Sequence, residues 1–408
     1  MPQRKPFIPL LLVLATAAAF SSAAEEGPTI GFVGDIMFHS SQLRRAWLGK
    51  DDSGADRGYD FSPSFEWITP YLEAPDLMIG NLETTLGGPG SALITEERYA
   101  FREYQAYPTF TAPDELAPAL ASAGFDLLGT ANNHCLDSGL EGASRTLDRL
   151  EEAGLAATGT AAEGSPMPWR GEIGGYNLSV LAWTASTNGI IFPRGMESVN
   201  VFNHGGHDER LAEMLKEIRE EAARGPDLLI LFIHWGLEYL EEPDRYQRNL
   251  ADLAFEAGAD VVIGSHPHVL QPVERRILDG PDGPREAFIA WSMGNFISSQ
   301  RHSEGPWEWV DGSVMITLGL GRDARGRARV SGLSFVPLYV HWTDGSIRVM
   351  AVGDGLAEEG RERFGLSDYD MERLTALDTW VPGQMTRYLG ALPARRSGVA
   401  WQVVFPEP

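Results

Sequence analysis

Two histidines stand two residues apart in the segment Asp260-Val-Val-Ile-Gly-Ser-His-Pro-His268. Its first four residues are mostly β-branched and apolar, which predicts a buried strand. Pro267 stiffens the loop that follows, because proline fixes its own φ and biases the residue before it toward an extended backbone. His266 and His268 can therefore approach a common point beyond the strand end, where α/β proteins place metal ligands. Two solvated loop histidines are the alternative interpretation.

Polar side chains follow other short apolar runs in the same way. The carboxylate of Asp35 can bind a hard or borderline divalent cation, and a helix N-cap is the competing interpretation. Asn81 and Glu83 lie two residues apart after another run, so their side chains can reach one face. At a third strand end, Asn133 offers a neutral oxygen ligand, which leaves His134 free to act as an acid or a positive stabiliser.

A further imidazole, that of His234, ends an apolar run, with Trp235 and Gly236 beside it. Each of these polar residues alone has an ordinary structural explanation as a cap, a turn or a satisfied core histidine. Together they stand at successive strand ends, which random placement rarely produces. The spacing therefore predicts one shared metal centre.

The elements that position these residues follow from the periodicity. Six apolar runs end in polar clusters, and helical stretches with a 3.6-residue period usually follow them, as in an α/β sheet that gathers its site at one carboxyl edge. Alternation between Trp169 and Trp183 predicts a hairpin, and the chain after Asn295 is expected to be β-rich. The predicted strands are Thr29–Val33, Asp76–Ile79, Phe125–Leu128, Leu228–Ile233, Asp260–Ile263 and Ala287–Trp291. The predicted helices lie within residues 113–124, 140–150, 211–222 and 246–257.

Composition limits the classes of partner. The chain has 408 residues, 43% of them hydrophobic, and a formal net charge of -24. Such a composition suits a large globular core. The acidic balance argues against nucleic acid as the main partner, because phosphate contacts need Lys and Arg. An anionic ligand would also be repelled unless a local basic cluster, for which Arg98, Arg102 and Arg194 are candidates, offsets the charge.

The N-terminus has the pattern of a secretory signal. Arg4 and Lys5 form a short basic region, and the apolar run from Phe7 to Phe20 is too short to span a bilayer comfortably. Small residues before Glu25 suit a signal peptidase, so residues 1–24 are predicted to be removed from a secreted or periplasmic protein. An uncleaved segment that anchors the protein in the membrane is the alternative.

The single cysteine, Cys135, excludes an internal disulfide. Its position beside His134 raises the question of a thiol nucleophile. Neighbouring side chains at a strand end point in opposite directions, so a Cys–His dyad is disfavoured and a buried bystander is the preferred interpretation.

In combination, these motifs resemble those of the CapA family, the bacterial capsule or poly-γ-glutamate synthesis proteins. The resemblance covers about residues 29–298. It rests on Gly34-Asp35, Asn81-Leu-Glu83, Ala131-Asn-Asn-His134, His234-Trp-Gly236, Gly264-Ser-His-Pro-His268 and Ser292-Met-Gly-Asn-Phe296, with Glu238-Tyr239 and Gln247 among the flanking matches. This family resembles the calcineurin-like metallophosphoesterases, which implies a β-sandwich flanked by helices, in four αββα layers. Residues 25–352 would form that domain, and residues 353–408 would be a C-terminal extension of unknown role.

The resemblance also implies a cofactor, a divalent metal present as one or two ions. The ligands would be Asp35 and His268 for one metal, Asn133, His234 and His266 for a second, and Glu83 in place of the bridging aspartate. Nitrogen and oxygen ligands fit Mn, Fe or Zn better than a metal that thiolates select. The ligand types do not distinguish among these three.

One departure from the phosphoesterase pattern concerns the first motif. That superfamily carries Asp-x-His, whereas the third position here is Met37, which cannot replace an imidazole. Asn81 and Glu83 also replace the usual second aspartate motif. The first metal therefore has few ligands, and a one-metal site stays open. His39 has the wrong spacing from Asp35 to match the known motif.

Two functions stay open from the sequence. The first is a secreted or periplasmic metal-dependent hydrolase of the capsule synthesis family, in which a metal-activated water attacks a phosphoester or amide bond, with His134 and Asn81 as catalytic residues. The second is a non-catalytic, metal-containing component that binds, exports or anchors an anionic capsule polymer. The expected partners are an anionic polymer or phosphoester substrate and membrane-bound capsule-synthesis proteins, and nucleic acid is not among them.

Overall fold

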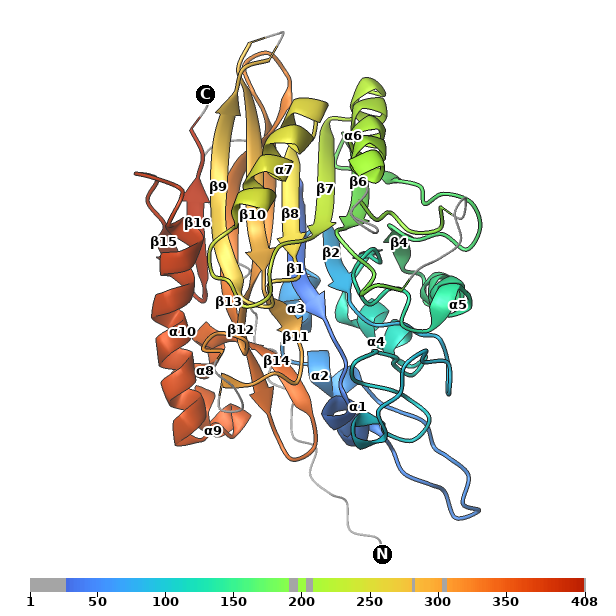
Figure 1. Ribbon diagram of the computed structural model, residues 1–408. Helices are drawn as coiled ribbons and strands as arrows, with labels where there is room; N and C mark the ends of the chain where they lie inside the picture. Colours follow the sequence, from blue (N-terminus) through green and yellow to red (C-terminus); the bar gives the residue numbers. More distant parts are fainter. Residues whose placement is uncertain (1–26, 191–196, 203–207, 281–282, 303–306, 407–408) are drawn as a thin grey trace, which may run out of the picture.

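The structure is a computed structural model of the chain, and it describes residues 27–190, 197–202, 208–280, 283–302 and 307–406. Two β-sheets pack face to face, and helices cover their outer faces (Figure 1). This is the helix-flanked β-sandwich of the calcineurin-like type that the sequence predicts. The predicted signal, residues 1–24, and Arg194 lie outside the described residues.

The larger sheet is mixed and contains both ends of the described chain. Its strands are β1 (Thr29–Ile36), β2 (Leu77–Leu82), β3 (Leu127–Gly129), β4 (Ala156–Thr158), β11 (Asn295–Ile297), β12 (Gly312–Arg322), β13 (Ala328–Trp342), β14 (Ile347–Ala351), β15 (Arg395–Ser397) and β16 (Ala400–Val404). They are ordered β15-β16-β13-β12-β1-β2-β3-β4, with β11 paired to β1 and β14 to β13.

The second sheet forms the other half of the sandwich. Its strands are β5 (Trp169–Ile173), β6 (Tyr176–Thr184), β7 (Leu228–His234), β8 (Val261–Ser265), β9 (Leu270–Leu278) and β10 (Arg285–Met293), in the order β5-β6-β7-β8-β10-β9. The predicted hairpin is confirmed, since β5 and β6 pair antiparallel. All six strands predicted to end in polar residues are present in one sheet or the other.

The helices have the following bounds: α1 (Ser40–Ala46), α2 (Ser62–Phe65), α3 (Thr69–Leu72), η1 (Glu97–Tyr99), α4 (Leu116–Ala123), α5 (Gly139–Glu152), α6 (Asp208–Ala223), α7 (Arg245–Ala257), α8 (Val352–Gly355), α9 (Gly360–Phe364) and α10 (Asp368–Thr386). The four predicted helices correspond to α4, α5, α6 and α7. Their apolar stripes face the sheets, as a surface helix requires.

The core lies in three apolar layers. Between the sheets, Phe32 and Ile79 meet Val180 and Ile230 in a cluster of fully buried side chains. A second layer joins the larger sheet to the N-terminal helices, and a third joins the smaller sheet to α6 and α7. Burial of such apolar surface contributes about 25 cal/mol per Å², so this arrangement holds the two sheets against each other.

The distribution of the predicted strands corrects one expectation. The sequence pattern suggests a single sheet with its site at one edge, but β1, β2 and β3 belong to the larger sheet, whereas β7, β8 and β10 belong to the smaller one. Strand pattern alone cannot assign a strand to one of two facing sheets, because strands buried on both faces look alike in sequence. The polar strand ends therefore meet across the sandwich.

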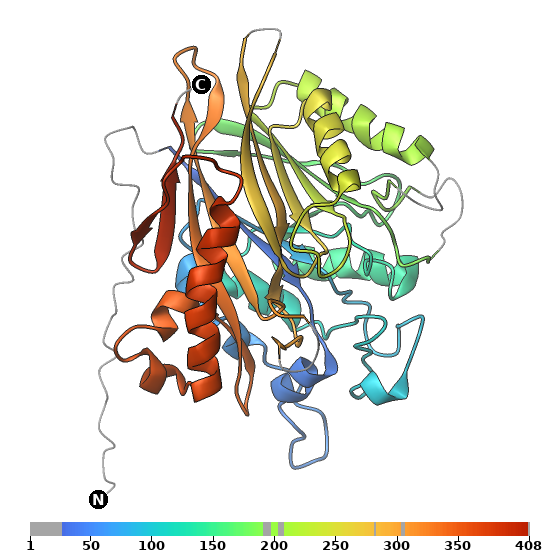
Figure 2. The same ribbon diagram turned by 60° about the vertical axis from the view of Figure 1, so that its left-hand side comes forward.

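The segment after residue 352 packs on both sheets. Figure 2 shows α10 lying alongside β9 and β13, with β15 and β16 beyond it. Arg373 of α10 makes a two-pronged ion pair with Asp311, at 2.7 and 3.2 Å, and both side chains are buried. Among the described residues, no helix combines the length and apolar character that crossing a membrane requires.

Glu217 on α6 provides a test of core electrostatics. Trp183 donates a 2.7 Å hydrogen bond to its carboxylate, and burial raises the pKa of Glu217 from 4.5 to about 7. Because the folded pKa lies above the unfolded value, the stability linked to Glu217 is present below 4.5 and is lost as the pH rises through about 7. Glu217→Gln is therefore expected to stabilise the protein by about 1–3 kcal/mol above the folded pKa and to change little below 4.5.

Urea unfolding of Glu217→Gln and the wild type on both sides of this window measures the effect. Glu213→Gln, which removes an exposed carboxylate on the same helix that does not act on Glu217, is the matched control and is expected to show no such pH dependence. An equal stability difference at both pH values for Glu217→Gln would show that this carboxyl does not titrate in the window.

Candidate metal centre

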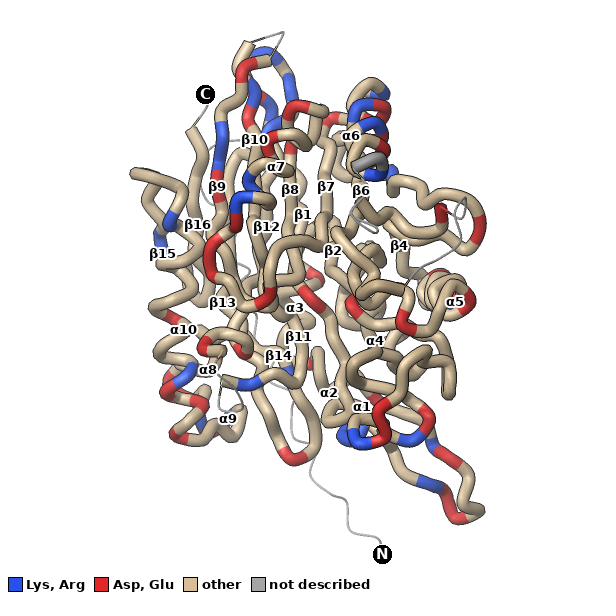
Figure 3. Tube along the Cα trace, in the orientation of Figure 1, with Lys and Arg blue, Asp and Glu red and all other residues tan. Residues whose placement is uncertain are grey.

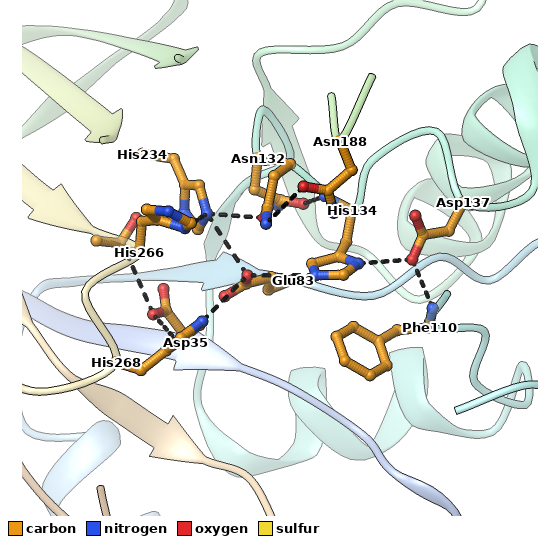
Figure 4. Close-up of polar contacts among 12 residues, drawn as sticks. Asp35, Glu83, Phe110, Asn132, His134, Asp137, Asn188, His234, His266 and His268 are labelled. Carbon is orange, nitrogen blue, oxygen red and sulfur yellow. Dashed lines mark hydrogen bonds and ion pairs between the residues drawn. The ribbon is translucent and has the colours of Figure 1, made fainter. Parts of the chain in front are cut away.

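The polar residues at the strand ends converge between the two sheets. Asp35 belongs to β1 and Glu83 follows β2 in the larger sheet, and His234 ends β7 in the smaller one. His266 and His268 come from the loop after β8, opposite them. Figure 4 shows these side chains pointing toward one another. The structure thus brings together residues that lie more than 230 positions apart in the sequence.

Two glycines allow the backbone to approach closely at this point. A Cβ atom at Gly34, just before Asp35, would lie 1.9 Å from the carbonyl oxygen of Gly294. A Cβ atom at Gly264 would lie 2.1 Å from the carbonyl oxygen of Trp291. Both distances are shorter than any van der Waals contact, so only glycine leaves room for the neighbouring strands.

The first group of side chains is centred on Asp35. His268 Nδ1 lies 3.2 Å from Asp35 Oδ2 and 3.0 Å from Asn295 Oδ1. The backbone N–H of His266 donates to Asp35 Oδ2 at 3.3 Å, and Asn81 Nδ2 donates to Oδ1 at 2.8 Å. Burial alone would lower the pKa of His268, but its hydrogen bond to Asp35 and the Asp35 charge raise it overall. These contacts fix the carboxylate and the imidazole as a pair.

The second group surrounds His234 Nε2. This atom lies 2.9 Å from Asn133 Oδ1, 3.1 Å from His266 Nδ1 and 3.5 Å from Glu83 Oε1. Burial lowers the pKa of His234 well below its usual value and that of His266 to about 3. Both imidazoles are therefore neutral near pH 7, which is the form that binds a metal ion.

Glu83 lies between the two groups and is fully buried. Its Oε1 lies 3.5 Å from His234 Nε2 and 4.0 Å from His268 Nε2, yet neither carboxylate oxygen has a hydrogen-bond partner among the described residues. Burial raises its pKa well above the usual value, and the Asp35 charge raises it further. A buried carboxylate without donors is costly, and a bound cation would compensate this cost.

The types and the spacing of these side chains fit a divalent metal. Glu83, His266 and His268 have ligand atoms within 4.8 Å of one another, and so do Asp35, Glu83 and His234. Glu83 is common to both groups, and each group combines members of the two expected ligand sets: His266 with His268, and Asp35 with His234. Nitrogen and oxygen ligands of this kind suit Mn, Fe or Zn. The described residues can thus hold a metal, and its identity and number stay predictions.

His134 stands beside the cluster and makes its strongest contact elsewhere. Its Nδ1 lies 2.7 Å from Asp137 Oδ2, and its Nε2 lies 4.0 Å from Glu83 Oε1. The Phe110 ring packs 4.2 Å from the imidazole, and the Phe110 N–H donates to the same Asp137 oxygen at 2.5 Å. Asp137 therefore holds the His134 ring so that Nε2 faces the centre (Figure 4). Sequence reasoning missed this role of Asp137, although its spacing of three residues from His134 was a usable signal.

Asn81 lies buried between two candidate ligands, in a position that does not suit contact with a substrate. It is 1% exposed, and its Nδ2 lies 2.8 Å from Asp35 Oδ1 and 3.2 Å from His234 Nδ1. Asn132 Nδ2 donates to the Asn81 carbonyl oxygen at 3.2 Å. In this position Asn81 orients two candidate ligands, and its catalytic role stays a prediction.

The histidine loop corrects one backbone expectation. Proline at position 267 predicts an extended His266, but His266 has φ = 97° and His268 has φ = 59°. Residues other than glycine rarely adopt this left-handed region, and such outliers concentrate at functional sites. Here the turn directs the His266 N–H to Asp35 and its ring to His234. Tertiary contacts therefore override the local preference.

Met37 and His39, which were considered at the first metal motif, and Cys135, which was considered as a nucleophile, lie outside the two ligand groups. Met37 is 2% exposed in the core, and His39 packs its ring 4.8 Å from Phe110, with burial lowering its pKa to about 4. Cys135 is buried in an apolar cluster, and burial raises its pKa to about 12, as expected of a bystander. Cys135 lies in a turn and not at the strand end that was expected.

The suggested basic cluster does not form from its described members. Arg98 pairs with Glu96 at 2.8 Å, and Arg102 pairs with Asp56. Each guanidinium is thus matched by a carboxylate within its own neighbourhood. These two arginines therefore do not form the local positive cluster that would attract an anionic ligand.

Comparison with known proteins adds family information. The family model described as "Bacterial capsule synthesis protein PGA_cap" matches residues 29–300. The "Capsule biosynthesis protein CapA" of Bacillus anthracis is 26% identical over 305 residues, which cover 72% of this chain and 67% of the relative. The "PGA biosynthesis protein CapA" of Bacillus subtilis (strain 168) is 25% identical over 350 residues, or 82% of this chain and 80% of the relative. The matched region contains all the candidate ligands.

Proposed function

This chain belongs to the bacterial capsule synthesis protein PGA_cap family, and from that premise we propose that it is a metal-dependent hydrolase of capsule or poly-γ-glutamate biosynthesis. It would cleave a phosphoester or an amide bond. The protein would act outside the cytoplasm, either secreted or in the periplasm. Its substrate would be the capsule polymer or a molecule derived from that polymer, and membrane-bound synthesis proteins would be its partners.

The observation that carries this proposal is the environment of Glu83. A fully buried carboxylate that has no hydrogen-bond donor in the part of the chain that the structure describes lies within 4.0 Å of three imidazoles from different strand ends. Protonation, which the raised pKa favours, removes the charge but still leaves two buried oxygens without partners among the described residues, and this is costly. A cation-binding role accounts for the carboxylate and for the neutral imidazoles of His234 and His266 beside it.

The chain's own residues divide the work as follows. Asp35, Glu83, Asn133, His234, His266 and His268 would hold the metal. A divalent cation bound there supplies Lewis-acid chemistry, which polarises a substrate oxygen and makes water a stronger nucleophile. His134 would carry a proton on Nε2, with Asp137 accepting from Nδ1, and would give that proton to the leaving group as its bond to phosphorus or carbon breaks.

Metal analysis combined with turnover tests the proposal. Purified protein is expected to contain one or two equivalents of metal and to hydrolyse an aryl phosphate or a γ-glutamyl arylamide. Activity should disappear on chelation and return on adding Mn, because the ligands are already arranged by the fold. Glu217→Gln, which removes a carboxyl group far from the centre, is the control and should contain as much metal as the wild type. Stoichiometric metal without turnover on any such substrate would contradict the hydrolase.

The surroundings of Asp35 favour a second candidate, a non-catalytic component that uses the metal to bind an anionic capsule polymer. Met37 is buried at the position where the phosphoesterase pattern places a histidine, so the group around Asp35 has few ligands. On this account, polymer binding measured by co-sedimentation survives His134→Ala and is lost on chelation. Binding that chelation leaves unchanged would exclude it.

A further inference from the structure

The Glu238-Tyr239 pair, which the hydrolase proposal leaves unused, lies at the edge of the metal centre. It belongs to the loop between β7, which ends at His234, and α7. The Tyr239 ring stacks on Trp307, with centroids 4.5 Å apart and planes at 24°, and it lies 6.1 Å from the His268 ring. An aromatic pair thus stands directly beside a candidate metal ligand. Both residues are half-buried.

The backbone at Tyr239 is in an unfavourable conformation. Its φ is 66°, in the left-handed region that bulky residues rarely adopt. The Tyr239 N–H donates to the carbonyl of Pro267 at 2.8 Å, between the two histidines of the site. Such a conformation persists only where the surroundings over-determine it, and it recurs at ligand-binding positions.

Hydrogen bonds connect the Tyr239 hydroxyl to the centre. Gln300 Nε2 donates to this hydroxyl at 3.1 Å, and Asn295 Nδ2 donates to Gln300 Oε1 at 2.8 Å. The Asn295 carbonyl oxygen then lies 3.0 Å from His268 Nδ1. Gln384 of α10 holds the same loop by donating to the Glu241 carbonyl at 2.6 Å. The Tyr239 ring is therefore held in place before any ligand arrives, which reduces the entropic cost of binding.

The electrostatic surroundings favour positive charge. The exposed Glu238 carboxylate lies close enough to act on Glu83, whose pKa rises first by burial and then by the Asp35 and Glu238 charges. Burial also raises the pKa of Tyr239 to about 12, so its ring is a neutral phenol. The charged and titratable groups that act most strongly on the described centre are carboxylates and imidazoles. Lys and Arg lie at the tips of β9 and β10, on α6, α7 and β15, near α1 and beside α8 (Figure 3).

We propose that Tyr239, Trp307 and Glu238 form a subsite that binds an ammonium group of the substrate next to the reacting bond. Ring faces attract a cation through their quadrupole, and Trp does so most strongly. Glu238 adds a carboxylate at the solvent side, which complements the same charge. The inference rests on the proposed function for the reaction, and it identifies the substrate as one that carries a positive group at that point. An anionic group there would be repelled.

A pair of probes that differ only in charge tests the subsite. Choline and its neutral isostere 3,3-dimethylbutanol are titrated calorimetrically into the full chain in the presence of a chelator, so that turnover plays no part. Choline is expected to bind about tenfold more tightly than the isostere, which is the size of an ordinary cation–π preference. Equal affinity of the two probes in the wild-type protein would overturn the proposal without any variant.

Three variants locate the binding. Trp307→Ala and Glu238→Gln are each expected to reduce choline affinity by about five- to tenfold. Trp401→Ala, a half-buried tryptophan on β16, is the matched control and should leave choline affinity unchanged. Choline binding that survives Trp307→Ala and Glu238→Gln but is lost in Glu83→Gln would place the cation among the metal ligands and contradict the subsite. Failure of the hydrolase proposal would appear separately, as metal-loaded protein without turnover.

Discussion

Replacing His134 with alanine is expected to lower kcat by about 10²- to 10⁴-fold, the usual contribution of a positioned general acid. The residue is suited to this role because its Nδ1 is held 2.7 Å from Asp137, while its Nε2 faces the centre and lies 4.0 Å from Glu83. His134 lies outside both groups of mutually close ligand atoms, so the metal content of His134→Ala should equal that of the wild type. Steady-state kinetics and metal analysis of the same preparation measure both quantities.

Asp137→Asn is the companion variant, because Asp137 acts through His134 rather than on the substrate. It should reduce kcat by about tenfold with little change in KM, and it should move the alkaline limb of the pH–rate profile to lower pH, since the amide no longer stabilises the imidazolium that acts as the acid. A purely structural role for Asp137 would leave the pH profile in place. Loss of metal from His134→Ala would instead make His134 a ligand and contradict the assignment.

Glu83→Gln is expected to abolish stoichiometric metal binding. Glu83 is the carboxylate common to both ligand groups, and a neutral amide replaces its charge without changing its shape. The wild type should gain thermal stability on adding Mn, by about 4 kcal/mol at a metal concentration a thousand times the Kd. Glu83→Gln should gain almost none, because the metal no longer binds the folded state. Differential scanning fluorimetry with and without metal records the difference.

The chelated proteins provide a second measurement at the same position. Burial holds the pKa of Glu83 well above its usual value, so its contribution to stability is present at acid pH and is lost as the pH rises toward the folded pKa. Chelated Glu83→Gln should therefore be at least as stable as the chelated wild type at neutral pH. A large loss of stability in the chelated variant would show that Glu83 serves packing rather than metal binding. Glu217→Gln, away from the centre, should keep the full metal response.

The elements of the fold were largely predictable from the chain. The 3.6-residue stripe of α7, for example, is closed by Gly258, and the residue-by-residue alternation in β6 marks a strand. The C-terminal helix was harder to recognise, since only a weak helical stretch was visible near Asp370 to Leu377. Its full extent, Asp368–Thr386, depends on contacts with β9 and β13 and on the Arg373–Asp311 pair. Such contacts join residues that no local pattern relates.

The candidate site was predictable in composition and incomplete in detail. Asp35, Glu83, Asn133, His234, His266 and His268 lie together, as their positions at strand ends suggested. The partners that hold them were missed: Asp137 behind His134, Ser265 Oγ at 2.9 Å from His234 Nδ1, and the Asn295–Gln300–Tyr239 connection. Ser265, Asn295 and Gln300 are of types common in loops, and their spacing along the chain carries no signal of contact, whereas the three-residue spacing of Asp137 from His134 was a usable signal.

The sequence by itself determined which side chains can bind a cation and that each stands at the end of a strand, because strand ends and imidazoles are local features. Only the tertiary structure decided that these ends face one another across two sheets and that His266 adopts a positive φ. It also decided that Glu83 is buried between the sheets with no donor among the described residues. The physical reason is that long-range packing fixes the distances between segments and overrides local backbone preference wherever burial stabilises the whole more than the strained residue costs.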